Sequence, residues 1–580
     1  MDIPFKSYWD LLWTHVRPQM SRFILLVVLL FTSIGLQIFN PQIMRYFIDT
    51  ALGNQDGPLM LAAIAFISIA IIQQVVAVWA TYTGENVAWT ATNELRAELA
   101  AHCLRLDMSF HNDTSPGELI ERIDGDVMEL STFFSSIVIR IFGNLLLLMG
   151  VLVVLFFEDW RLGLVFVIFS IITLYVLNLV RGVAVPYQKK FREATADLFG
   201  FIEERLAGTE DIRSSGAVDF VINGLYQSQH VVYRFWRKRE MAFMLVRFLG
   251  GFLMVGGTAI AFVLGYSLFQ DGILTIGAVY LVIRYVQMIS RPIRELTQQA
   301  ESIQNVGASI ERLSDLRKLQ SKILDGPGAA IQEGALSLDF DRVDFSYVES
   351  EPLLHQMSFS LAPGKVLGVL GRTGSGKTTL TRLIFRLYDP VSGTIRLGGT
   401  DIRQAKVDHL RSRVAMVTQE VQLFKATVRD NLTLFNRQIP DERILDVIRE
   451  LGLSRWYESL PNGLDTELES EGRGLSAGEA QLLAFTRVFL HNPGLVIMDE
   501  ASSRLDPATE QLIERAVDKL LENRTAIIVA HRLGTIERAD EIMILDKGQV
   551  IEKGERESLA HQPDSHFHHL LQTGLEEVLA

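Results

Sequence analysis

The residues best suited to chemistry form one glycine-rich run, Gly371-Arg372-Thr373-Gly374-Ser375-Gly376-Lys377-Thr378. The run matches the pattern G-x-x-x-x-G-K-[ST] and follows an apolar stretch, so it predicts a strand, a phosphate-binding loop and a helix. Glycines let several backbone N–H groups point at one phosphate chain, and the helix start adds its positive dipole end. In this interpretation Lys377 neutralises the β- and γ-phosphates and Thr378 binds Mg²⁺. The alternative is an ordinary glycine turn.

Two carboxylates and a histidine follow predicted strands further along the chain. Asp499 and Glu500 end the apolar run that begins at Leu495. Asp499 suits a Mg²⁺ contact, and Glu500 suits activation of an attacking water. His531 follows the next apolar run, where it could contact a γ-phosphate. Taken singly, such residues are more often structural.

Two more residues suit a nucleotide site by their position. Gln419 follows the predicted strand Val414 to Val417, and Tyr347 precedes the phosphate loop, where its ring could stack on a base. All the candidates lie in the half of the chain that alternates short strands and helices. This pattern predicts an α/β domain with a phosphate loop, which begins after a linker containing Gly326-Pro327-Gly328.

Charge and cysteine content exclude some classes of partner and site. The formal net charge is −13 and no basic arm stands out, which argues against a nucleic-acid partner. Cys103 is the only cysteine, so an intrachain disulfide and a thiol-based metal site are excluded.

The first half of the chain holds six apolar stretches long enough to cross about 30 Å of hydrocarbon. They lie near 23–48, 59–82, 135–157, 161–182, 245–268 and 275–297. The connections are short after the first, third and fifth stretches and long after the second and fourth. The long connections hold most of the Lys and Arg, so both termini and these connections are expected in the cytoplasm. Residues 1–20 predict an amphipathic helix at the membrane interface, or else a helix packed on protein.

The long connections keep helical periodicity, so the spans are expected to continue as helices into the cytoplasm. Each connection has a break near its middle, at Asp107–Asn112 and at Ala207–Asp211. A break could present a small helix to a soluble domain or be a simple loop apex.

Arg284 lies inside the sixth predicted span, where a cation is costly unless it faces protein, water or a counter-charge. It could contact a substrate in a central cavity. It could equally snorkel or pair with an acidic residue for structural reasons.

The order of these motifs, with Leu475-Ser476-Ala477-Gly478-Glu479, resembles the ATP-binding cassette (ABC) family. The half that precedes them resembles its exporter-type half-transporters. The resemblance implies an elbow helix at 1–20, a six-helix all-α transmembrane domain at 21–315, a linker at 316–335, a cassette at 336–572 and a tail at 573–580.

The same resemblance implies roles for the candidate residues. Tyr347 would stack on adenine, Gly371 to Thr378 would hold the phosphates, and Gln419 would link Mg²⁺ and water to the membrane half. Glu500 would be the catalytic base and His531 the γ-phosphate sensor. Two cassettes would face each other, so that Leu475 to Glu479 contact the ATP of the other subunit. Ser503 and Asp506 would cross the dimer interface, and the two breaks would be coupling helices.

The signature segment departs from the usual L-S-G-G-Q of the family at Ala477 and Glu479. An added methyl group and a carboxylate would crowd or repel the γ-phosphate. Alternatively, Ser476 and Glu479 form a capping box that leaves the nucleotide alone. Because the phosphate loop, Glu500 and His531 are complete, this pattern favours a heterodimer with a different half-transporter.

We therefore predict a subunit that exports a hydrophobic or amphipathic substrate, a drug or a lipid, from a bacterial inner membrane by ATP-driven alternating access. The cofactors implied are ATP and Mg²⁺. The alternatives are an ATP-gated regulatory or channel subunit and an importer with the same fold.

Overall fold

The computed structural model describes residues 13–53, 57–135, 140–348, 351–418, 421–469, 475–499, 507–529 and 536–573. The chain divides into two compact units. The first comprises Met1–Leu104 and Pro116–Leu319, and the second comprises Arg105–Ser115 and Gln320–Ala580. The short segment Arg105–Ser115, which contains the first predicted break, is therefore part of the second unit.

The first unit is entirely helical in its described part. Its elements are η1 Arg17–Gln19, α2 Met20–Leu52, α3 Leu59–Arg105, α5 Pro116–Ile120, the π-helical η2 Glu121–Asp126, α6 Val127–Ser135, α7 Gly143–Glu158, α8 Trp160–Ala207, α9 Thr209–Ser214, α10 Val218–Gln270 and α11 Ile276–Lys318. The predicted interfacial helix at 1–20 falls mostly on residues 1–12, which lie outside the described residues.

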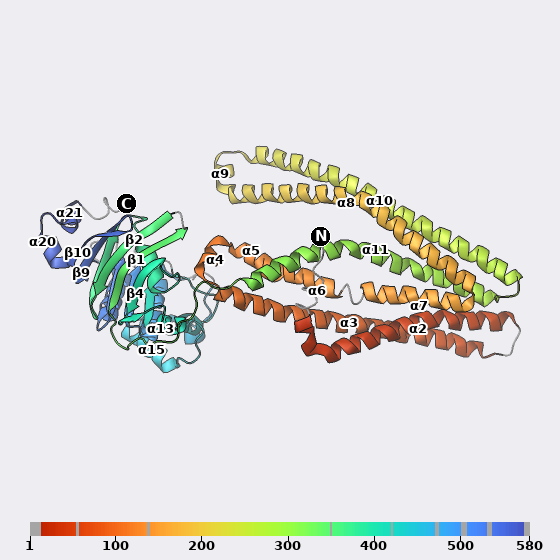
Figure 1. Cartoon of the computed structure of the whole chain (residues 1–580), viewed down its shortest axis with the longest axis horizontal. Helices are drawn as coiled ribbons and strands as arrows, with labels where there is room; N and C mark the ends of the chain where they lie inside the picture. The colour runs from red at the N-terminus through yellow and green to blue at the C-terminus, as the bar shows by residue number, and fades with distance from the viewer. Residues whose placement is uncertain are drawn as a thin grey trace. The chain divides into compact units, whose positions relative to one another are not determined.

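Three helices are far longer than a bilayer requires. α3, α8 and α10 have 47, 48 and 53 residues. At about 1.5 Å per residue they extend roughly 70–80 Å, more than twice the hydrocarbon thickness. Figure 1 shows α8 and α10 running side by side, joined by α9. The expected continuation of the spans as unbroken helices is confirmed.

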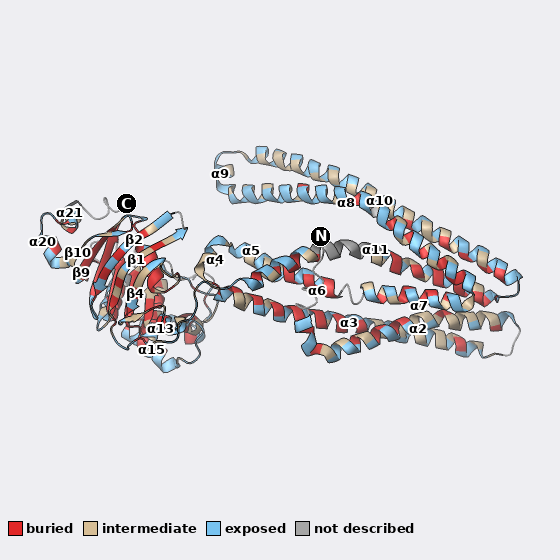
Figure 2. Ribbon diagram, viewed as in Figure 1, coloured by how far each residue is buried: buried red, intermediate tan, exposed pale blue. Residues whose placement is uncertain are grey.

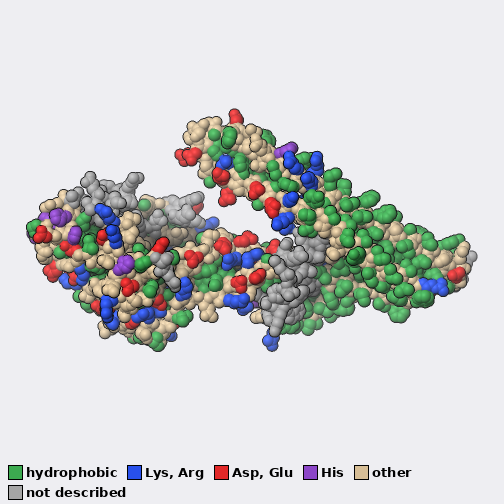
Figure 3. Space-filling model, turned by 45° about the horizontal axis from the view of Figure 1, so that its top comes forward, with side chains coloured by type: hydrophobic (Ala, Val, Ile, Leu, Met, Phe, Trp, Pro, Cys, Tyr) green, Lys and Arg blue, Asp and Glu red, His purple; other side chains and the backbone are tan. Residues whose placement is uncertain are grey.

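Five helices in the described part of the chain are long and apolar enough to cross a membrane: Trp13–Leu52, Leu59–Arg105, Arg140–Glu158, Trp160–Ala207 and Val218–Gln270. On the face seen in Figure 3, hydrophobic side chains cover a continuous part of the bundle that they form, whereas charged side chains are frequent elsewhere on it. The helix at the sixth predicted span, α11, is not one of the five, because Arg284, Gln287 and Arg291 make it more polar. The count of six spans therefore stays a prediction.

α11 packs against α2, α6, α7, α8 and α10. Leu281, Tyr285 and Ile289 on this helix are fully buried. The hydroxyl group of Tyr285 donates a hydrogen bond to the carbonyl of Ile38 on α2, at 2.8 Å. Arg284, Gln287 and Arg291 are all exposed, so α11 has a buried apolar side toward the other helices and a polar side that these helices leave uncovered.

The second unit combines two sheets with short helices. The strands are β1 Leu338–Val348, β2 Glu351–Leu361, β3 Val366–Gly371, β4 Ser392–Leu397, β5 Thr400–Asp401, β6 Val414–Val417, β7 Leu495–Asp499, β8 Thr525–Val529, β9 Glu541–Asp546 and β10 Gln549–Glu555. One sheet has the order β2-β1-β4-β5 and is antiparallel. The other has the order β10-β9-β3-β8-β7-β6, with all neighbours parallel except β10 and β9.

The helices of the second unit are α4 Met108–Asp113, α12 Lys377–Ile384, α13 Val407–Arg413, α14 Val428–Thr433, α15 Asp441–Glu450, α16 Ser454–Ser459, η4 Gly463–Asp465, α17 Ala477–His491, α18 Pro507–Leu521, α20 Arg556–His561 and α21 His566–Thr573. One core lies between the two sheets and includes α12, and a second unites the six-stranded sheet with α15, α17 and α18. Buried residues accordingly follow both sheets in Figure 2. The α/β class predicted for this half is confirmed.

Both breaks in the long connections contain a short helix. α4 occupies the first break and α9 the second. Asp107 caps α4, since its Oδ1 accepts a hydrogen bond from the N–H of Ser109 at 3.0 Å. The structure therefore favours a small helix over a plain loop apex at each position.

Candidate active site

The phosphate loop lies at the carboxyl end of β3, which is flanked by β9 and β8 in the sheet. Gly374 and Gly376 have φ values of +82° and +107°, in the region that favours glycine. A Cβ at Gly371 would lie 2.3 Å from the carbonyl oxygen of Leu545, and one at Gly376 would lie 2.6 Å from Leu354. The fold therefore requires glycine at both ends of the loop.

The contacts of Lys377 close the loop. This buried residue begins α12, and its Nζ donates hydrogen bonds to the carbonyl oxygens of Gly371 at 2.5 Å and Arg372 at 3.1 Å. A Cβ on Gly374 would meet nothing within 4 Å, so there is open space above the turn. The buried Oγ of Ser375 has no hydrogen-bond partner among the described residues. An ammonium group, an unsatisfied hydroxyl and a helix start around open space fit a phosphate chain.

The strand register brings a carboxylate residue, Asp499, to this edge of the sheet. Val369 on β3 pairs with Val529 on β8, which pairs with Asp499 at the end of β7. Met498 on β7 pairs with Val417 on β6. Because the carboxyl ends of parallel strands share one edge, Asp499 lies on the same edge of the sheet as the phosphate loop. Gln419, Glu500 and His531 follow these strand ends in the sequence and lie outside the described residues.

Tyr347 is fixed to the helix that follows the loop. Its hydroxyl group lies 3.1 Å from Oγ1 of Thr379 and accepts a hydrogen bond from Nη1 of Arg382 at 3.1 Å. The guanidinium carbon of Arg382 lies 5.9 Å from the centre of the tyrosine ring. Tyr347 is 41% exposed, so part of the ring is open to a ligand. Thr378, which directly precedes Thr379, is the second residue of α12.

The signature segment begins α17, and its polar residues bond to one another. Oγ of Ser476 accepts a hydrogen bond from the N–H of Glu479 at 3.2 Å, and the carboxylate of Glu479 accepts from the Ser476 N–H at 2.7 Å. The Ser476 hydroxyl also lies 2.8 Å from that carboxylate. This is the capping box that the sequence allowed. Ala477 and Gly478 form the first turn after Leu475 and Ser476, whereas Ser503 and Asp506 lie outside the described residues.

Comparison with known proteins places this arrangement in a family. The family model for the ABC transporter transmembrane region matches residues 23–293, and the model for the ABC transporter matches residues 354–503. An uncharacterized ABC transporter ATP-binding protein, YknV of Bacillus subtilis, is 31% identical over 96% of this chain and 93% of its own length. The chain belongs to the ABC transporter family.

Two further comparisons extend this result. An ATP-dependent lipid A-core flippase of Idiomarina loihiensis is 28% identical over 97% of both chains. A solved bacterial Atm1-family ABC exporter with ATP bound has a TM-score of 0.79 at 23% identity, covering 95% of this chain and 99% of its own, which shows the same fold. This ABC protein is a membrane ATPase whose ATP hydrolysis is coupled to transport.

The transmembrane unit of this ABC protein contains a cavity of about 780 Å³ among α2, α3, α7 and α11. Among the described residues, the charged ones in its lining are Arg140, Arg291 and Glu295. Uncharged polar side chains, among them Gln37 and Gln74, and apolar ones, among them Leu30 and Ile34, complete the lining. A wall that is partly charged and partly apolar suits an amphipathic molecule better than a purely hydrocarbon one.

Arg284 does not line this cavity. It is exposed, and its Nη1 donates a hydrogen bond to Oε1 of Gln287 on the same helix at 3.3 Å. The lining residues Arg140 and Arg291 were missed in the sequence, although both lie inside predicted spans. The signal that could have found them is a charged residue within a span, which is costly unless it serves a site.

Proposed function

We propose that this chain is one half of a dimeric ABC exporter that moves an acidic amphiphile out of the inner leaflet of a bacterial inner membrane. The observation that carries this proposal is the cavity that contains Arg140, Arg291 and Glu295. Two guanidinium groups against one carboxylate among its described lining residues favour a ligand with negative charge. The flippase relative is named for a lipid, and a lipid is an amphiphile, which agrees with the proposed substrate class.

The depth of the cavity supports an inner-leaflet substrate. Arg140 lies 18 residues before Glu158 on the third span, and Arg291 lies 15 residues after Ile276 on α11. At about 1.5 Å per residue these separations are roughly 27 and 22 Å, close to the full hydrocarbon thickness. Glu158 and Ile276 adjoin the short connections, which the distribution of Lys and Arg assigns to the outside. Both arginines then lie near the cytoplasmic side.

Hydrolysis follows from the residues around the phosphate loop. We infer that Lys377 and the loop N–H groups hold the phosphates of ATP, while Thr378, Asp499 and Gln419 hold Mg²⁺. When bound, Mg²⁺ would neutralise the negative charge that develops on the phosphoryl oxygens. Glu500 orients and deprotonates the attacking water, and His531 contacts the transferred phosphate.

In this proposal the signature segment at the start of α17 contacts the ATP bound by another subunit. Each ATP site therefore needs the signature segment of a second subunit to be complete. The helices beside α9 also carry large apolar side chains in a part expected outside the bilayer. Phe220 is 78% exposed and Leu206 is 69% exposed. An apolar surface of this kind suits a protein partner.

We favour a different half-transporter as the second subunit over a second copy of this chain. The phosphate loop and Glu500 are complete, whereas Ala477 and Glu479 alter the segment that this chain lends. A partner with a usual signature would complete one competent site. The other site would be impaired.

Lipid movement in proteoliposomes tests the proposed substrate. The full chain, with any subunit that co-purifies, is reconstituted with fluorescent phosphatidylglycerol or phosphatidylcholine and given ATP outside. We expect ATP-dependent movement of the anionic lipid from the ATP-exposed leaflet, reduced about tenfold by Arg291→Gln and not by Arg161→Gln, an arginine outside the cavity lining. Lys377→Ala should abolish the ATP dependence. Equal movement of both lipids, or movement in the opposite direction, would contradict the proposal.

A further inference from the structure

Tyr388 connects α4 to the tyrosine of the nucleotide site. It lies in the turn after α12 and is largely buried. Its hydroxyl oxygen accepts a hydrogen bond from Nδ2 of Asn112 on α4 at 2.6 Å. These two residues are 276 positions apart in the sequence, yet both belong to the second unit.

The ring of Tyr388 makes the second connection. Its centroid lies 5.1 Å from that of Tyr347, with an angle of 86° between the ring planes. Phe345 packs edge-on against both rings, at 4.9 Å from Tyr347 and 5.6 Å from Tyr388. Edge-to-face aromatic contacts depend on geometry, so a change in the orientation of one ring changes the energy of the others. Tyr388 therefore touches α4 with its hydroxyl group and the nucleotide site with its ring.

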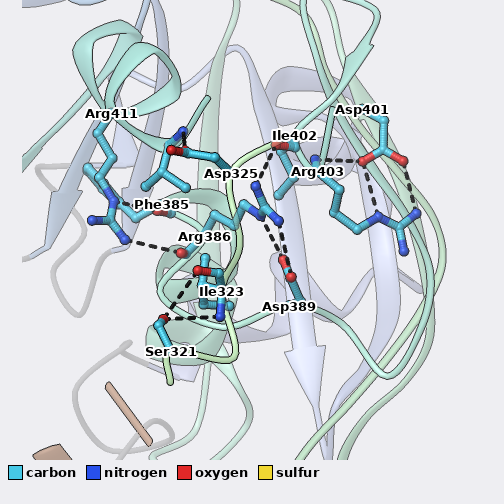
Figure 4. A network of polar contacts seen from close by, with 11 residues as sticks. Ser321, Ile323, Asp325, Phe385, Arg386, Asp389, Asp401, Ile402, Arg403 and Arg411 are labelled. Carbon is cyan, nitrogen blue, oxygen red and sulfur yellow. Dashed lines mark hydrogen bonds and ion pairs between the residues drawn. The ribbon is translucent and has the colours of Figure 1, made fainter. Parts of the chain in front are cut away.

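The turn that carries Tyr388 is held rigidly. Arg386 is buried and donates from Nε and Nη2 to the carboxylate of Asp389, at 2.8 and 3.3 Å (Figure 4). Its Nη1 donates to the carbonyl of Ile402 at 3.5 Å. Arg411 donates to the carbonyls of Phe385 at 3.3 Å and Arg386 at 3.2 Å. Because both sides of the turn are fixed, the backbone holds the side chain of Tyr388 between Asn112 and Tyr347.

α4 is anchored to the same unit at its start. Oδ2 of Asp107 accepts a hydrogen bond from the N–H of Lys322 at 2.6 Å, and Met108 packs against the core between the sheets. Asn112 lies one turn later, near the end of the helix. Its contact with Tyr388 therefore governs the far end of α4, while Asp107 holds the near end.

We propose that Tyr388 is a positioning residue that transmits the occupancy of the base site at Tyr347 to α4. This inference rests on the proposed nucleotide role of Tyr347. A base stacked on the open face of Tyr347 restricts that ring, the edge-to-face contact restricts Tyr388, and the hydroxyl group then orders Asn112. Coupling of this kind is reciprocal, so movement of α4 changes nucleotide affinity by the same factor.

Hydrogen–deuterium exchange of the full chain tests the proposal through the segment Arg105–Ser115. Mg²⁺ with the non-hydrolysable analogue AMP-PNP should slow exchange in this segment about threefold or more. Tyr388→Phe keeps the ring and removes the hydroxyl group, so the slowing should be lost while the Kd for AMP-PNP changes less than about threefold. Asn112→Ala should act in the same way. The double variant should add nothing further.

Tyr457→Phe is the matched control, because Tyr457 lies on α16 in the same unit and packs against the core of α15, α17 and α18, whereas Tyr388 belongs to the core between the sheets. It should respond like the unmodified chain. An unchanged response in Tyr388→Phe would overturn the proposal, as would a more than tenfold loss of affinity, which would place Tyr388 in the base site itself. If Tyr347→Ala leaves the Kd unchanged, the base-site assignment fails instead, and the proposal fails with it.

Discussion

Glu479 bonds to its own helix in the structure, and this decides how its charge acts. The carboxylate accepts from the N–H of Ser476 and lies beside the Ser476 hydroxyl group. The cap satisfies an N–H group at the start of the helix and stabilises α17 by about 1 kcal/mol. It also occupies the hydroxyl group that would face the phosphate of another subunit. The capping and altered-site interpretations are therefore compatible.

Replacing Glu479 separates these two effects. Glu479→Gln retains the capping box and removes the negative charge. We expect the ATP concentration for half-maximal ATPase activity of the purified transporter complex to fall about two- to tenfold, roughly 0.4–1.4 kcal/mol. Glu479→Ala serves as the comparison, since it removes both the charge and the cap. An unchanged ATP dependence in Glu479→Gln would show that the carboxylate does not affect the nucleotide.

Glu500 is the proposed base. Glu500→Gln should keep ATP binding and lower the ATPase rate about 10²–10⁴-fold, the usual contribution of a general base. A closed, ATP-loaded complex should accumulate, which single-turnover measurements with radiolabelled ATP would detect. Glu522→Gln, at an exposed position of the same unit, is the control. Turnover near the unmodified rate would remove Glu500 from this role.

At the scale of elements, the two short helices differ in how they are held. α4 has a side-chain cap from Asp107, whereas the residue before α9, Gly208, provides none. α4 also packs within the second unit, while the flanks of α9 expose Leu206 and Phe220. We infer that α4 is anchored by its own chain and that α9 depends on another subunit.

The anchoring of α4 should depend on pH. Burial alone would raise the pKa of Asp107, but hydrogen bonds from the N–H groups of Lys322 and Ser109 outweigh it and lower the pKa below 3.8. A carboxylate with a lowered pKa in the folded state stabilises the protein above its unfolded pKa, and this contribution is lost as pH falls through the folded pKa. Between pH 7 and 5 the unmodified chain should melt about 1–3 °C above Asp107→Asn.

That advantage should shrink below about pH 4, where the unfolded chain takes up a proton at Asp107 first, and it should vanish once the pH falls below the lower pKa of Asp107 in the folded chain. Thermal melting of the detergent-solubilised protein across this range measures it. Asp315→Asn, at an exposed carboxylate paired only with Lys318 among the described contacts, is the control. A difference that grows on acidification would contradict the assigned sign.

At the scale of the whole molecule, two features of the chain need a second subunit to complete or cover them. In the proposed dimer, the signature segment at Ser476 contacts the ATP that the phosphate loop of the other subunit holds. The apolar surface beside α9 lies open as well. Both features fit a half-transporter.

Purification of the chain alone tests the need for a different partner. We expect the chain alone to bind ATP but to have a steady ATPase activity at least tenfold below that of the complex isolated through an affinity tag. The reason is that both sites of a homodimer would contain the altered signature segment. Mass spectrometry of the tagged complex should reveal a second ABC half-transporter. High ATPase activity from a homodimer with two equivalent sites would contradict the heterodimer.

Much of the molecule could be predicted because its signals are local. The phosphate loop from Gly371 to Thr378 is contiguous, and its glycines and lysine carry their meaning without distant neighbours. The long helices follow from apolar composition and period, and the capping box follows from two residues three positions apart. Even the breaks at Asp107 and Gly208 could be located, although only the structure showed a helix at each.

The tertiary structure decided what depends on residues distant in sequence. Register alone brings Asp499 to the edge of the sheet that holds the phosphate loop. Packing of α11 in the bundle brings Arg291 and Arg140 to the lining of one cavity, whereas Arg284 is exposed outside that lining. The contact of Asn112 with Tyr388 likewise has no sequence signal, because periodicity reports which face of an element is apolar and not which element will cover it.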